Sequence, residues 1–233
     1  MQLVVNKIAK SFGQKEVLRD ISFTFESGYI YALLGKNGSG KTTLFNCLNG
    51  DIDIDSGKAE YIDAAGTRHQ VEPEDVGYVS ATPVLPGFLT GYEIVKFFID
   101  INREKCKLTQ NADDYLDMVK LNKEDRNRLI KDYSLGMKNK IQMLNFIITQ
   151  PPIILLDEPI TSLDIVTANQ IKTILRKMKE NHIIIFSTHL LNLAKEISDK
   201  IIVLNEGTLR SINLPENSTH LEQEVIKALG LEE

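Results

Sequence analysis

The chain has 233 residues, of which 42% are hydrophobic and 25% are charged, so it can bury a large core as one big domain or two small ones. Its formal net charge is −5, and because no long basic stripe offsets this balance, we expect no nucleic-acid partner. The two cysteines, Cys47 and Cys106, are isolated, which favours a reducing compartment over a disulfide framework.

No run of residues approaches the roughly 18 apolar residues of a membrane span. The segment from Met1 to Asn6 has no basic region followed by an apolar one, so it does not resemble a secretory signal. We therefore expect any membrane role to come through a partner protein.

Residues 1–30 alternate apolar and polar side chains around a polar turn at Gly13, a pattern typical of antiparallel, half-buried strands. Phe12 lies just before that turn, where an exposed ring could stack on adenine. Val17 could flank the same base. The alternative for Phe12 is a ring packed into the core.

The stretch from Gly35 to Thr42 satisfies the pattern G-x-x-x-x-G-K-[ST] of a phosphate-binding loop, or P-loop. Its glycines let successive N–H groups point into one concavity that no Cβ blocks. Lys41 would place an ammonium against the outer phosphates, and Thr42 would offer a hydroxyl to Mg²⁺. A buried strand is predicted over residues 29–34 and a helix over 43–49, which is the context that a P-loop requires.

Strands are predicted over residues 58–62 and 76–80, on either side of a polar loop. From Pro83 onward the patterns become helical, so we predict a helical subdomain of about residues 83–150 that is inserted into the core. Its expected helices cover residues 92–101, 111–120, 123–131 and 137–148, the last of which the prolines at 151 and 152 must end.

Aromatic and apolar side chains are unusually dense at the start of this helical segment. They either pack into its core or form an exposed site for a partner, and the sequence leaves both alternatives open. The side chains are Phe88, Leu89, Tyr92, Phe97 and Phe98.

Residues 153–156 are four apolar residues followed by Asp157 and Glu158, which indicates a central parallel strand ending in two carboxylates. The carboxyl end of such a strand is where α/β sheets place their ligands. Asp157 would help to hold Mg²⁺, and Glu158 would polarise an attacking water. The alternative is a strand that ends in a solvated acidic turn.

Further along the chain we expect a helix over residues 166–178, a buried strand over 183–187, and a helix over 191–197. A hairpin is predicted over residues 201–212, turned at Gly207. The buried strand delivers His189 just beyond its end, a position that by itself also suits a surface or capping histidine.

Together these elements predict an α/β fold. It has a P-loop NTPase core with a mainly parallel sheet, an N-terminal antiparallel β subdomain and an inserted helical subdomain.

Five short motifs occur in one order along the chain. This ordered set resembles the ATP-binding subunit of ABC transporters, in particular the bacitracin- and lantibiotic-type exporters. The motifs are the P-loop, Ser134-Leu135-Gly136, Asp157-Glu158, Ser162-Leu163-Asp164 and Thr188-His189.

The resemblance runs from about residue 3 to residue 212. It implies an ABC-type ATP-binding domain over residues 1–212, with the helical subdomain inserted, and a short helical tail over 213–233. It implies ATP and Mg²⁺ as ligands. The implied partners are an integral membrane transporter subunit and a second ATP-binding subunit, either a copy or a relative. The implied location is cytoplasmic, on the inner face of the cell membrane.

The resemblance also implies a role for individual side chains. Phe12 and Val17 would contact adenine, and Ser134 and Gly136 would complete the site of the opposing subunit. Asp164 would belong to the D-loop. The implied catalytic residues are Glu158, His189 and Lys41, and His189 would be the switch histidine that senses the γ-phosphate. The implied metal ligands are Thr42 and Asp157. The implied phosphate cradle consists of Gly35, Asn37, Gly38, Ser39, Gly40, Lys41, Thr42 and Thr43.

Two positions depart from the family pattern. The family usually has a glutamine after the Gly-Tyr-Val strand, where this chain has Ala81, and it usually has a glycine where this chain has Leu135. Because Gly136 is present, we expect the site to be functional. We expect the two departures to affect the coupling between nucleotide and partner more than nucleotide binding.

The leading hypothesis is an ATP-hydrolysing subunit that dimerises around ATP and powers a separate membrane subunit, with export of a peptide or amphiphilic compound. The alternatives are a soluble ABC ATPase in repair or assembly, a small P-loop kinase or GTPase, and a nucleotide-binding scaffold with low turnover. The chain has no inserted heptads and no second ATPase unit, which argues against the soluble class.

Overall fold

The structure is a computed structural model that describes residues 1–106, 110–159, 165–212 and 218–230. The chain divides into two compact units. The core unit comprises Met1–Tyr78, Pro152–Glu158 and the described part of Leu175–Glu233. The helical unit comprises Val79–Pro151 and the described part of Pro159–Ile174, so it takes in a segment beyond the predicted insertion of residues 83–150.

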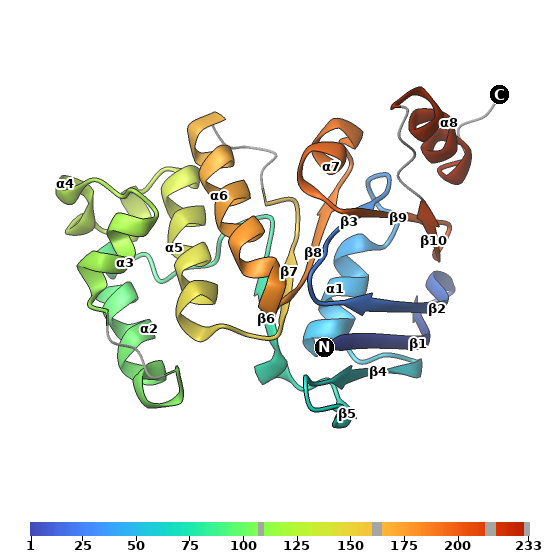
Figure 1. Ribbon diagram of the computed structural model, residues 1–233, viewed down its shortest axis with the longest axis horizontal. Coiled ribbons are helices and arrows are strands. Elements are labelled where there is room, and N and C mark those ends of the chain that lie inside the picture. The colour runs from blue at the N-terminus through green and yellow to red at the C-terminus, as the bar shows by residue number, and fades with distance from the viewer. Residues whose placement is uncertain (107–109, 160–164, 213–217, 231–233) are drawn as a thin grey trace. The chain divides into compact units, whose positions relative to one another are not determined.

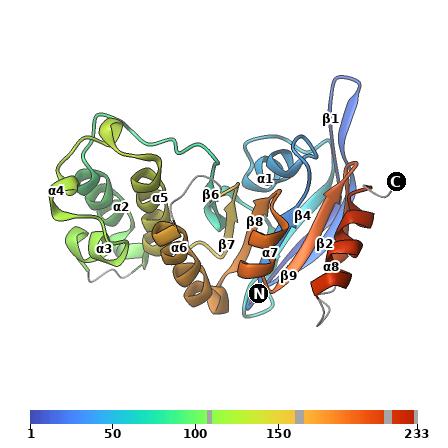
Figure 2. The same cartoon turned by 90° about the horizontal axis from the view of Figure 1, so that it is seen from above.

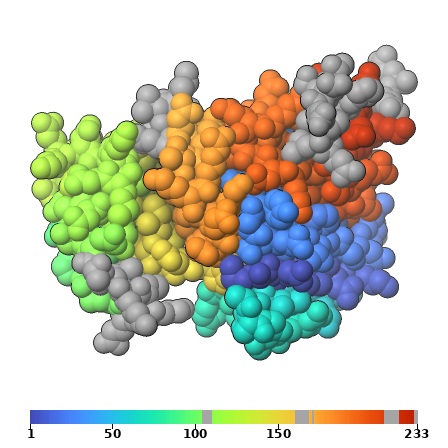
Figure 3. All heavy atoms as spheres, viewed as in Figure 1, coloured from blue at the N-terminus to red at the C-terminus, as the bar shows by residue number. Residues whose placement is uncertain are grey.

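An antiparallel four-stranded sheet opens the core unit, with the strand order β2-β1-β4-β5. Leu3 pairs with Phe25 across the first hairpin, and both side chains are buried, as the alternating pattern predicts. On the face shown in Figure 3, atoms of β1 (dark blue) lie beside the β4–β5 region (cyan). The strands are β1 (Gln2–Phe12), β2 (Lys15–Glu26), β4 (Ser56–Ile62) and β5 (Arg68–Gln70).

Strand β5 falls inside the predicted polar loop, so the sequence interpretation missed it. All three of its residues are exposed, and an exposed edge strand of this length carries no apolar alternation to reveal it.

A six-stranded sheet, with the order β10-β9-β3-β8-β7-β6, forms the rest of the core unit's framework. Strands β3, β8, β9 and β7 are parallel to their neighbours in this set, while β10 is antiparallel to β9. Every residue of β3, β7 and β8 is buried, which explains the apolar sequences of β3 and β7 and of the first four residues of β8. The strands are β3 (Ile30–Leu34), β6 (Val76–Val79), β7 (Ile153–Leu156), β8 (Ile183–Thr188), β9 (Lys200–Asn205) and β10 (Thr208–Ile212).

Helix α1 (Lys41–Asn49) joins the two sheets of the core unit (Figure 1). Leu44, Phe45 and Leu48 are buried in one cluster with side chains of both sheets. This packing fixes the P-loop, because the loop connects β3 directly to α1. Helices α7 (Leu191–Ile197) and α8 (Ser218–Ala228) complete the unit, α7 beside β3 and β8 and α8 beside β9 and β10 (Figure 2).

The helical unit has its own apolar core, which contains Val95, Tyr115, Leu116, Ile141 and Leu144. Its helices are α2 (Gly91–Cys106), α3 (Ala112–Met118), α4 (Lys123–Arg126) and α5 (Leu135–Thr149), and α6 (Ile165–Met178) contributes residues to both units. Short 3₁₀ turns cover Pro73–Asp75, Ile130–Asp132 and Lys179–Asn181.

The predicted helix over residues 123–131 is wrong in extent. Helix α4 ends at Arg126, Leu129 is extended, and a separate 3₁₀ turn follows. This segment is dominated by charge and has no apolar stripe to hold a longer helix against the unit's core.

The five aromatic and apolar side chains at the start of the helical segment divide between the two predicted alternatives. Leu89, Tyr92 and Phe98 pack against the apolar core, whereas Phe88 is 78% exposed and Phe97 is 52% exposed. Within the described ranges, no helix combines the length and apolar character that a membrane crossing needs.

Candidate active site

Three parallel strands of the core unit deliver the predicted site residues to one edge of the sheet. Leu34 at the end of β3 pairs with Thr188 at the end of β8, and Leu156 at the end of β7 pairs with Phe186 of β8. Because parallel strands end at the same edge, the P-loop after β3, the carboxylates after β7 and His189 after β8 meet there.

The buried ammonium of Lys41 lies at the centre of this edge. Its side chain donates hydrogen bonds to the carbonyl oxygens of Gly35, at 2.8 Å, and Lys36, at 3.2 Å. Its Nζ is 3.8 Å from Oε1 of Glu158. Burial lowers the pKa of Lys41, and the nearby carboxylates of Glu158 and Asp157 only partly oppose that shift. The site therefore holds a positive charge that its surroundings do not fully neutralise.

Two glycines are required by the geometry of the loop. A Cβ at Gly35 would lie 2.5 Å from Oγ of Ser39 and 2.7 Å from the carbonyl oxygen of Leu204, too close for any other residue. Gly40 has φ +106°, and a Cβ there would meet Val17. The glycines thus let the loop lie close against its neighbours while α1 begins at Lys41.

A cavity of about 530 Å³ borders the loop, a volume within the usual range for small-molecule sites. Val17, on β2, lines it. Phe12 pairs with Lys15, another lining residue, across the β1–β2 hairpin. The Phe12 ring is 50% exposed, which excludes the alternative that it packs into the core. The loop contributes Lys36, Asn37, Gly38 and Ser39 to the lining.

A chain of hydrogen bonds links Thr42 to both carboxylate residues. The Thr42 hydroxyl donates to Oδ2 of Asp157 at 2.7 Å. Ser187, in β8, donates to Oδ1 of Asp157 at 2.5 Å and accepts the backbone N–H of Glu158 at 2.9 Å. Asp157 is 4% exposed and Ser187 is fully buried, so the bond between these two residues is shielded from water, whereas Thr42 lies at the exposed end of the network.

Glu158 faces both cationic and titratable partners. Its Oε1 lies 3.1 Å from Nδ1 of His189 and within ion-pair distance of Lys41. The residue has φ +49°, a left-handed conformation that is uncommon for a residue with a side chain. Strained backbone of this kind clusters at functional sites.

These side chains fit Mg²⁺ and a polyphosphate. Thr42 and Asp157 place two oxygen atoms together, the ligand type that Mg²⁺ prefers. Within the residues that the structure describes, the buried Oγ of Ser39 has no hydrogen-bond partner, and it lies in the loop where a phosphate oxygen would be received. A Cβ at Gly38 would meet nothing within 4 Å, so the loop opens onto empty space there.

The remaining predicted residues do not belong to the core unit's cluster. Ser134 and Gly136 lie in the helical unit at the start of α5, where the Ser134 hydroxyl caps the helix by accepting the N–H of Met137 at 3.2 Å. Asp164 lies outside the described residues. Thr43, in the first turn of α1, is half-buried.

A family model described as ABC transporter matches residues 18–161, more than half of the chain. The chain belongs to the ABC transporter family. It is the ATP-binding subunit type, and such a cassette binds ATP with Mg²⁺ and hydrolyses ATP.

Curated relatives of this ABC cassette include two proteins without an assigned cargo. The uncharacterized ABC transporter ATP-binding protein MJ1023 of Methanocaldococcus jannaschii is 32% identical over 88% of this chain and 75% of the relative. The uncharacterized ABC transporter ATP-binding protein YdbJ of Bacillus subtilis is 29% identical over 90% of this chain and 68% of the relative. The sulfate/thiosulfate import ATP-binding protein CysA of Synechococcus elongatus is also 29% identical, over 91% of this chain, which spans 62% of that relative.

Solved structures share the fold. One described as the ATP binding subunit of an ABC transporter has a TM-score of 0.80 and 22% identity, covering 97% of this chain and 99% of that one. A dimeric post-hydrolysis cassette bound to ADP and Pi has a TM-score of 0.76 and 23% identity, covering 92% of this chain and 100% of that one. At these identities the likeness establishes the fold of this ABC cassette.

Sequence reasoning missed two side chains beside the Asp157 carboxylate. Ser187 is one, and its only sequence signal is a polar residue that follows four apolar residues in a buried strand. Tyr78 is the other: burial, together with the nearby Asp157 and Asp51 carboxylates, raises its pKa to about 12, so its hydroxyl stays protonated. Ser187 belongs to none of the five motifs, and Tyr78 lies in the Gly-Tyr-Val strand, whose pattern gives it no role; the fold brings both residues to the site.

Proposed function

We propose that this chain is the nucleotide-binding half of a transporter, which dimerises around ATP and powers a separate membrane-spanning subunit. The observation that carries this proposal is a cluster at one sheet edge. Glu158 lies within ion-pair reach of Lys41 and hydrogen-bond reach of His189, and Asp157 accepts the hydroxyl of Thr42 beside Lys41. This arrangement suits water as the acceptor of the γ-phosphoryl group, because a carboxylate that can orient water and a cation converge there.

In this proposal each residue acts through its observed contacts. Lys41 leaves its carbonyl partners and binds the outer phosphates. Thr42 would offer an oxygen lone pair to Mg²⁺, and its hydroxyl hydrogen would remain hydrogen-bonded to Asp157, so both interactions could coexist. Mg²⁺ would neutralise charge on the phosphates. Glu158 orients the attacking water, and His189, bonded to Glu158, senses the γ-phosphate.

The rest of the cradle follows from the loop. Backbone N–H groups of the glycine-rich turn would receive the phosphate oxygens, and the N-terminus of α1 would add its dipole. Phe12 and Val17 would bound the adenine. The cradle residues are Gly35, Asn37, Gly38, Ser39, Gly40 and Thr43.

The second half of each site would come from another ATP-binding subunit, either a copy or a relative. Helix α5 has 15 residues, begins after the Ser134 cap and has no acidic residue in its first turn, so its N-terminus suits a γ-phosphate. Ser134 and Gly136 of one subunit would face the P-loop of the other, with Asp164 contributing from the D-loop. Hydrolysis would remove the charge that holds the two subunits together.

The membrane partner would dock on exposed apolar side chains of the helical unit. Val84 is 82% exposed and Phe88 is 78% exposed, in one loop that begins beside Ala81, and apolar side chains exposed together on one surface mark interaction sites. In this proposal the chain lies on the cytoplasmic face of the cell membrane. If a Val84→Ser/Phe88→Ser variant still co-purifies with its membrane subunit, this docking surface is refuted.

Export of a peptide or amphiphilic compound, as in bacitracin- and lantibiotic-type exporters, is the cargo that we propose, from the resemblance of the motif set. The CysA relatives carry names that state sulfate or thiosulfate import, and they supply the opposite direction as the competing outcome. We also propose residues 1–212 as the ABC domain, with residues of about 83–150 inserted and 213–233 as a short helical tail.

A low-turnover nucleotide-binding scaffold is the second candidate, and Ala81 favours it. The methyl group of Ala81 cannot bind Mg²⁺ or orient water, and the neighbouring Ser80 hydroxyl is committed to the carbonyl of Thr82 at 2.6 Å. An Ala81→Gln variant that gains turnover supports this candidate, whereas an unchanged rate makes the missing glutamine trivial.

The decisive experiment uses the Glu158→Gln variant, in which ATP binds but turnover falls about 10²- to 10⁴-fold. Light scattering with and without Mg²⁺ and ATP measures the mass of the particle. We expect ATP to convert monomer into dimer. The matched control, Glu158→Gln combined with Lys41→Ala, stays monomeric because it lacks the phosphate-binding cation. A monomer at saturating ATP in the single variant would refute the proposal.

A further inference from the structure

The fully buried hydroxyl of Ser187 touches both carboxylate residues of the site at once. Its Oγ accepts the backbone N–H of Glu158 at 2.9 Å and donates to Oδ1 of Asp157 at 2.5 Å. The residue is 0% exposed, so water does not compete for either bond. Neither the family motifs nor the predicted site residues include it.

The direction of both hydrogen bonds is fixed by chemistry. A backbone N–H can only donate, so the oxygen of Ser187 must act as the acceptor toward Glu158. The hydroxyl hydrogen is then committed to Asp157. Ser187 therefore has one orientation that satisfies both neighbours.

This orientation fixes the Asp157 carboxylate from two sides. Oδ1 is held by Ser187 from β8, and Oδ2 accepts the hydroxyl of Thr42 from α1 at 2.7 Å. A carboxylate with a donor on each oxygen cannot rotate without losing a bond in a buried setting. The oxygen atoms offered to a divalent cation are thereby held in a single arrangement.

The other bond of Ser187 holds the backbone at Glu158. That residue has φ +49°, and its carboxylate lies 3.1 Å from Nδ1 of His189. A left-handed residue needs surrounding contacts to hold it there, and the N–H bond to Ser187 is one such contact at that residue. The direction in which the Glu158 side chain leaves the chain depends on this contact.

The neighbouring hydroxyl in the same strand shows the contrast. Thr188 is equally buried, but its Oγ1 accepts the N–H of Leu190 at 3.1 Å. That bond shapes the start of α7. Adjacent hydroxyls of β8 thus face different neighbours.

We propose that Ser187 is a positioning residue for ATP hydrolysis, which aligns the Mg²⁺-side carboxylate of Asp157 and the water-orienting Glu158 through one hydroxyl. The inference rests on the roles proposed above for Asp157 and Glu158. It assigns Ser187 no contact with ATP. Its effect is on turnover and on Mg²⁺ dependence, and not on the binding of nucleotide without metal.

The test compares Ser187→Ala and Ser187→Thr with Ser198→Ala in the full chain. Ser198 is a matched control because its hydroxyl donates to the carbonyl of Ala194 at 2.7 Å in the same unit. Each protein is measured for kcat, for the Mg²⁺ concentration at half-maximal rate, and for ATP binding in EDTA. Circular dichroism reports the folded fraction.

We expect Ser187→Ala to lower kcat and to raise the half-saturating Mg²⁺ concentration, each by about 10- to 100-fold, the range for partners that orient metal-site ligands. ATP binding in EDTA stays within about twofold, because the positioned carboxylates do not contact the base or the P-loop amides. Ser187→Thr keeps a hydroxyl and recovers most of both losses. Ser198→Ala changes neither quantity.

Three results would overturn the inference. One is a folded Ser187→Ala protein with wild-type kcat and Mg²⁺ dependence. Another is a Ser187→Thr protein as defective as Ser187→Ala. The third is failure of Ser187→Ala to fold, since the hydroxyl would then serve the fold itself.

An Asp157→Asn variant separates this inference from the proposed function. If Asp157→Asn leaves the Mg²⁺ dependence unchanged, the metal role assigned to Asp157 is wrong, and the inference falls with it. If Asp157→Asn shifts that dependence while Ser187→Ala does not, only the role of Ser187 is wrong.

Discussion

The core unit and the helical unit each bury a cation, and the two cations are treated in opposite ways. Lys41 in the core unit is 6% exposed and Arg126 in the helical unit is 5% exposed. Lys41 hydrogen-bonds to two neutral carbonyls and has its nearest carboxylate oxygen 3.8 Å away. Arg126 bonds to two carboxylates and a carbonyl.

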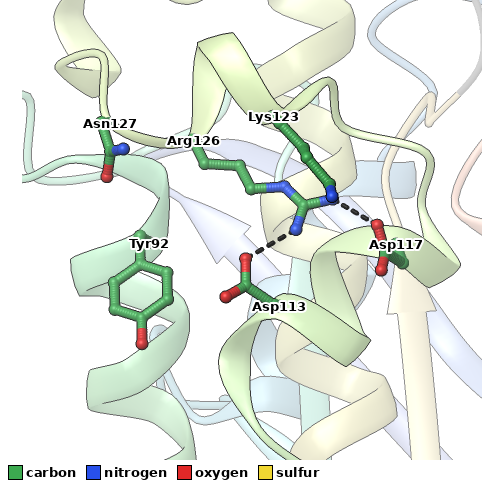
Figure 4. A pocket seen from close by; sticks show the side chains of 6 residues that line it. All are labelled: Tyr92, Asp113, Asp117, Lys123, Arg126 and Asn127. Carbon is green, nitrogen blue, oxygen red and sulfur yellow. Dashed lines mark hydrogen bonds and ion pairs between the residues drawn. The ribbon is translucent and has the colours of Figure 1, made fainter.

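Figure 4 shows the guanidinium of Arg126, on α4, reaching between Asp113 and Asp117 of α3. The distance to Asp113 Oδ1 is 2.6 Å, and the carbonyl of Leu121 accepts at 3.2 Å. These side chains line a pocket of about 470 Å³ together with Tyr92. Burial lowers the pKa of Arg126, but the hydrogen bonds and charges of Asp117 and Asp113 outweigh it, so the pKa is raised.

The difference separates a cation that serves the fold from one that serves a ligand. Arg126 is saturated by fixed partners, so its charge is stabilised in the folded protein. Lys41 keeps neutral partners that a polyphosphate can replace, and its lowered pKa records that its charge lacks full compensation. A ligand with several negative charges would supply the compensating charge that Lys41 lacks in the protein alone.

The strongest test of this comparison is Lys41→Ala. We expect ATPase activity to fall by about 10²- to 10³-fold, because a preorganised cation that stabilises transferring phosphoryl groups is lost. The free energy of unfolding should not decrease, because the variant removes a buried charge that is poorly paired. Steady-state phosphate release and urea denaturation measure the two quantities. A variant that loses its fold while keeping activity per folded molecule would reverse the comparison.

The complementary change is Arg126→Met, which keeps much of the apolar stem. We expect the free energy of unfolding to fall by about 1–3 kcal/mol, because the buried carbonyl of Leu121 loses its donor and the aspartates, which are more than half exposed, can turn to water. Urea denaturation measures this loss. ATP binding at the P-loop should persist, and Arg126→Lys should recover little, since an ammonium cannot make the same forked bonds. If Arg126→Met lost ATP binding as well as stability, the assignment of Arg126 to the fold and of Lys41 to the ligand would be contradicted.

A pH series sharpens the comparison further. Because the folded pKa of Lys41 is lowered from its ordinary value of 10.5, the unfolded chain holds more protons between the folded pKa and 10.5, and stability rises with pH in that window. The difference in unfolding free energy between wild type and Lys41→Ala should therefore move in favour of wild type as pH rises toward 10.5. Urea denaturation of both proteins at several pH values up to 10 measures this difference. A difference that does not change with pH would show that the charge of Lys41 is fully compensated in the folded protein.

The sequence was informative about the core unit's site because strand ends carry motifs. The P-loop, the pair Asp157-Glu158 and His189 each follow a buried and mainly apolar strand, so their common edge was predictable. Their distances were not, and neither was Ser187, because a single hydroxyl in a buried strand has no local pattern.

The helical unit was predictable only in outline. The periodicity of α2 and α5 predicted helices, whereas the break after Arg126 was missed, because charged residues leave no apolar stripe to read. The pairing of Arg126 with Asp113 joins residues 13 positions apart, beyond the spacing of neighbours on one helix. Tertiary placement, and not composition, made this arginine a buried one.

The smallest expected effect comes from an exposed ion pair in the same unit. Lys96 and Asp100 lie at positions i and i+4 on α2, 2.5 Å apart, with side chains 57% and 49% exposed. Because water and salt screen such pairs, Lys96→Ala should change the free energy of unfolding by at most about 0.5 kcal/mol. The measurement is urea denaturation beside Arg126→Met, in low and high salt. Equal losses of stability in the two variants would show that burial does not explain the importance of Arg126. A nearly neutral Lys96→Ala beside a destabilised Arg126→Met would show that Arg126 matters because it is buried and has several fixed partners.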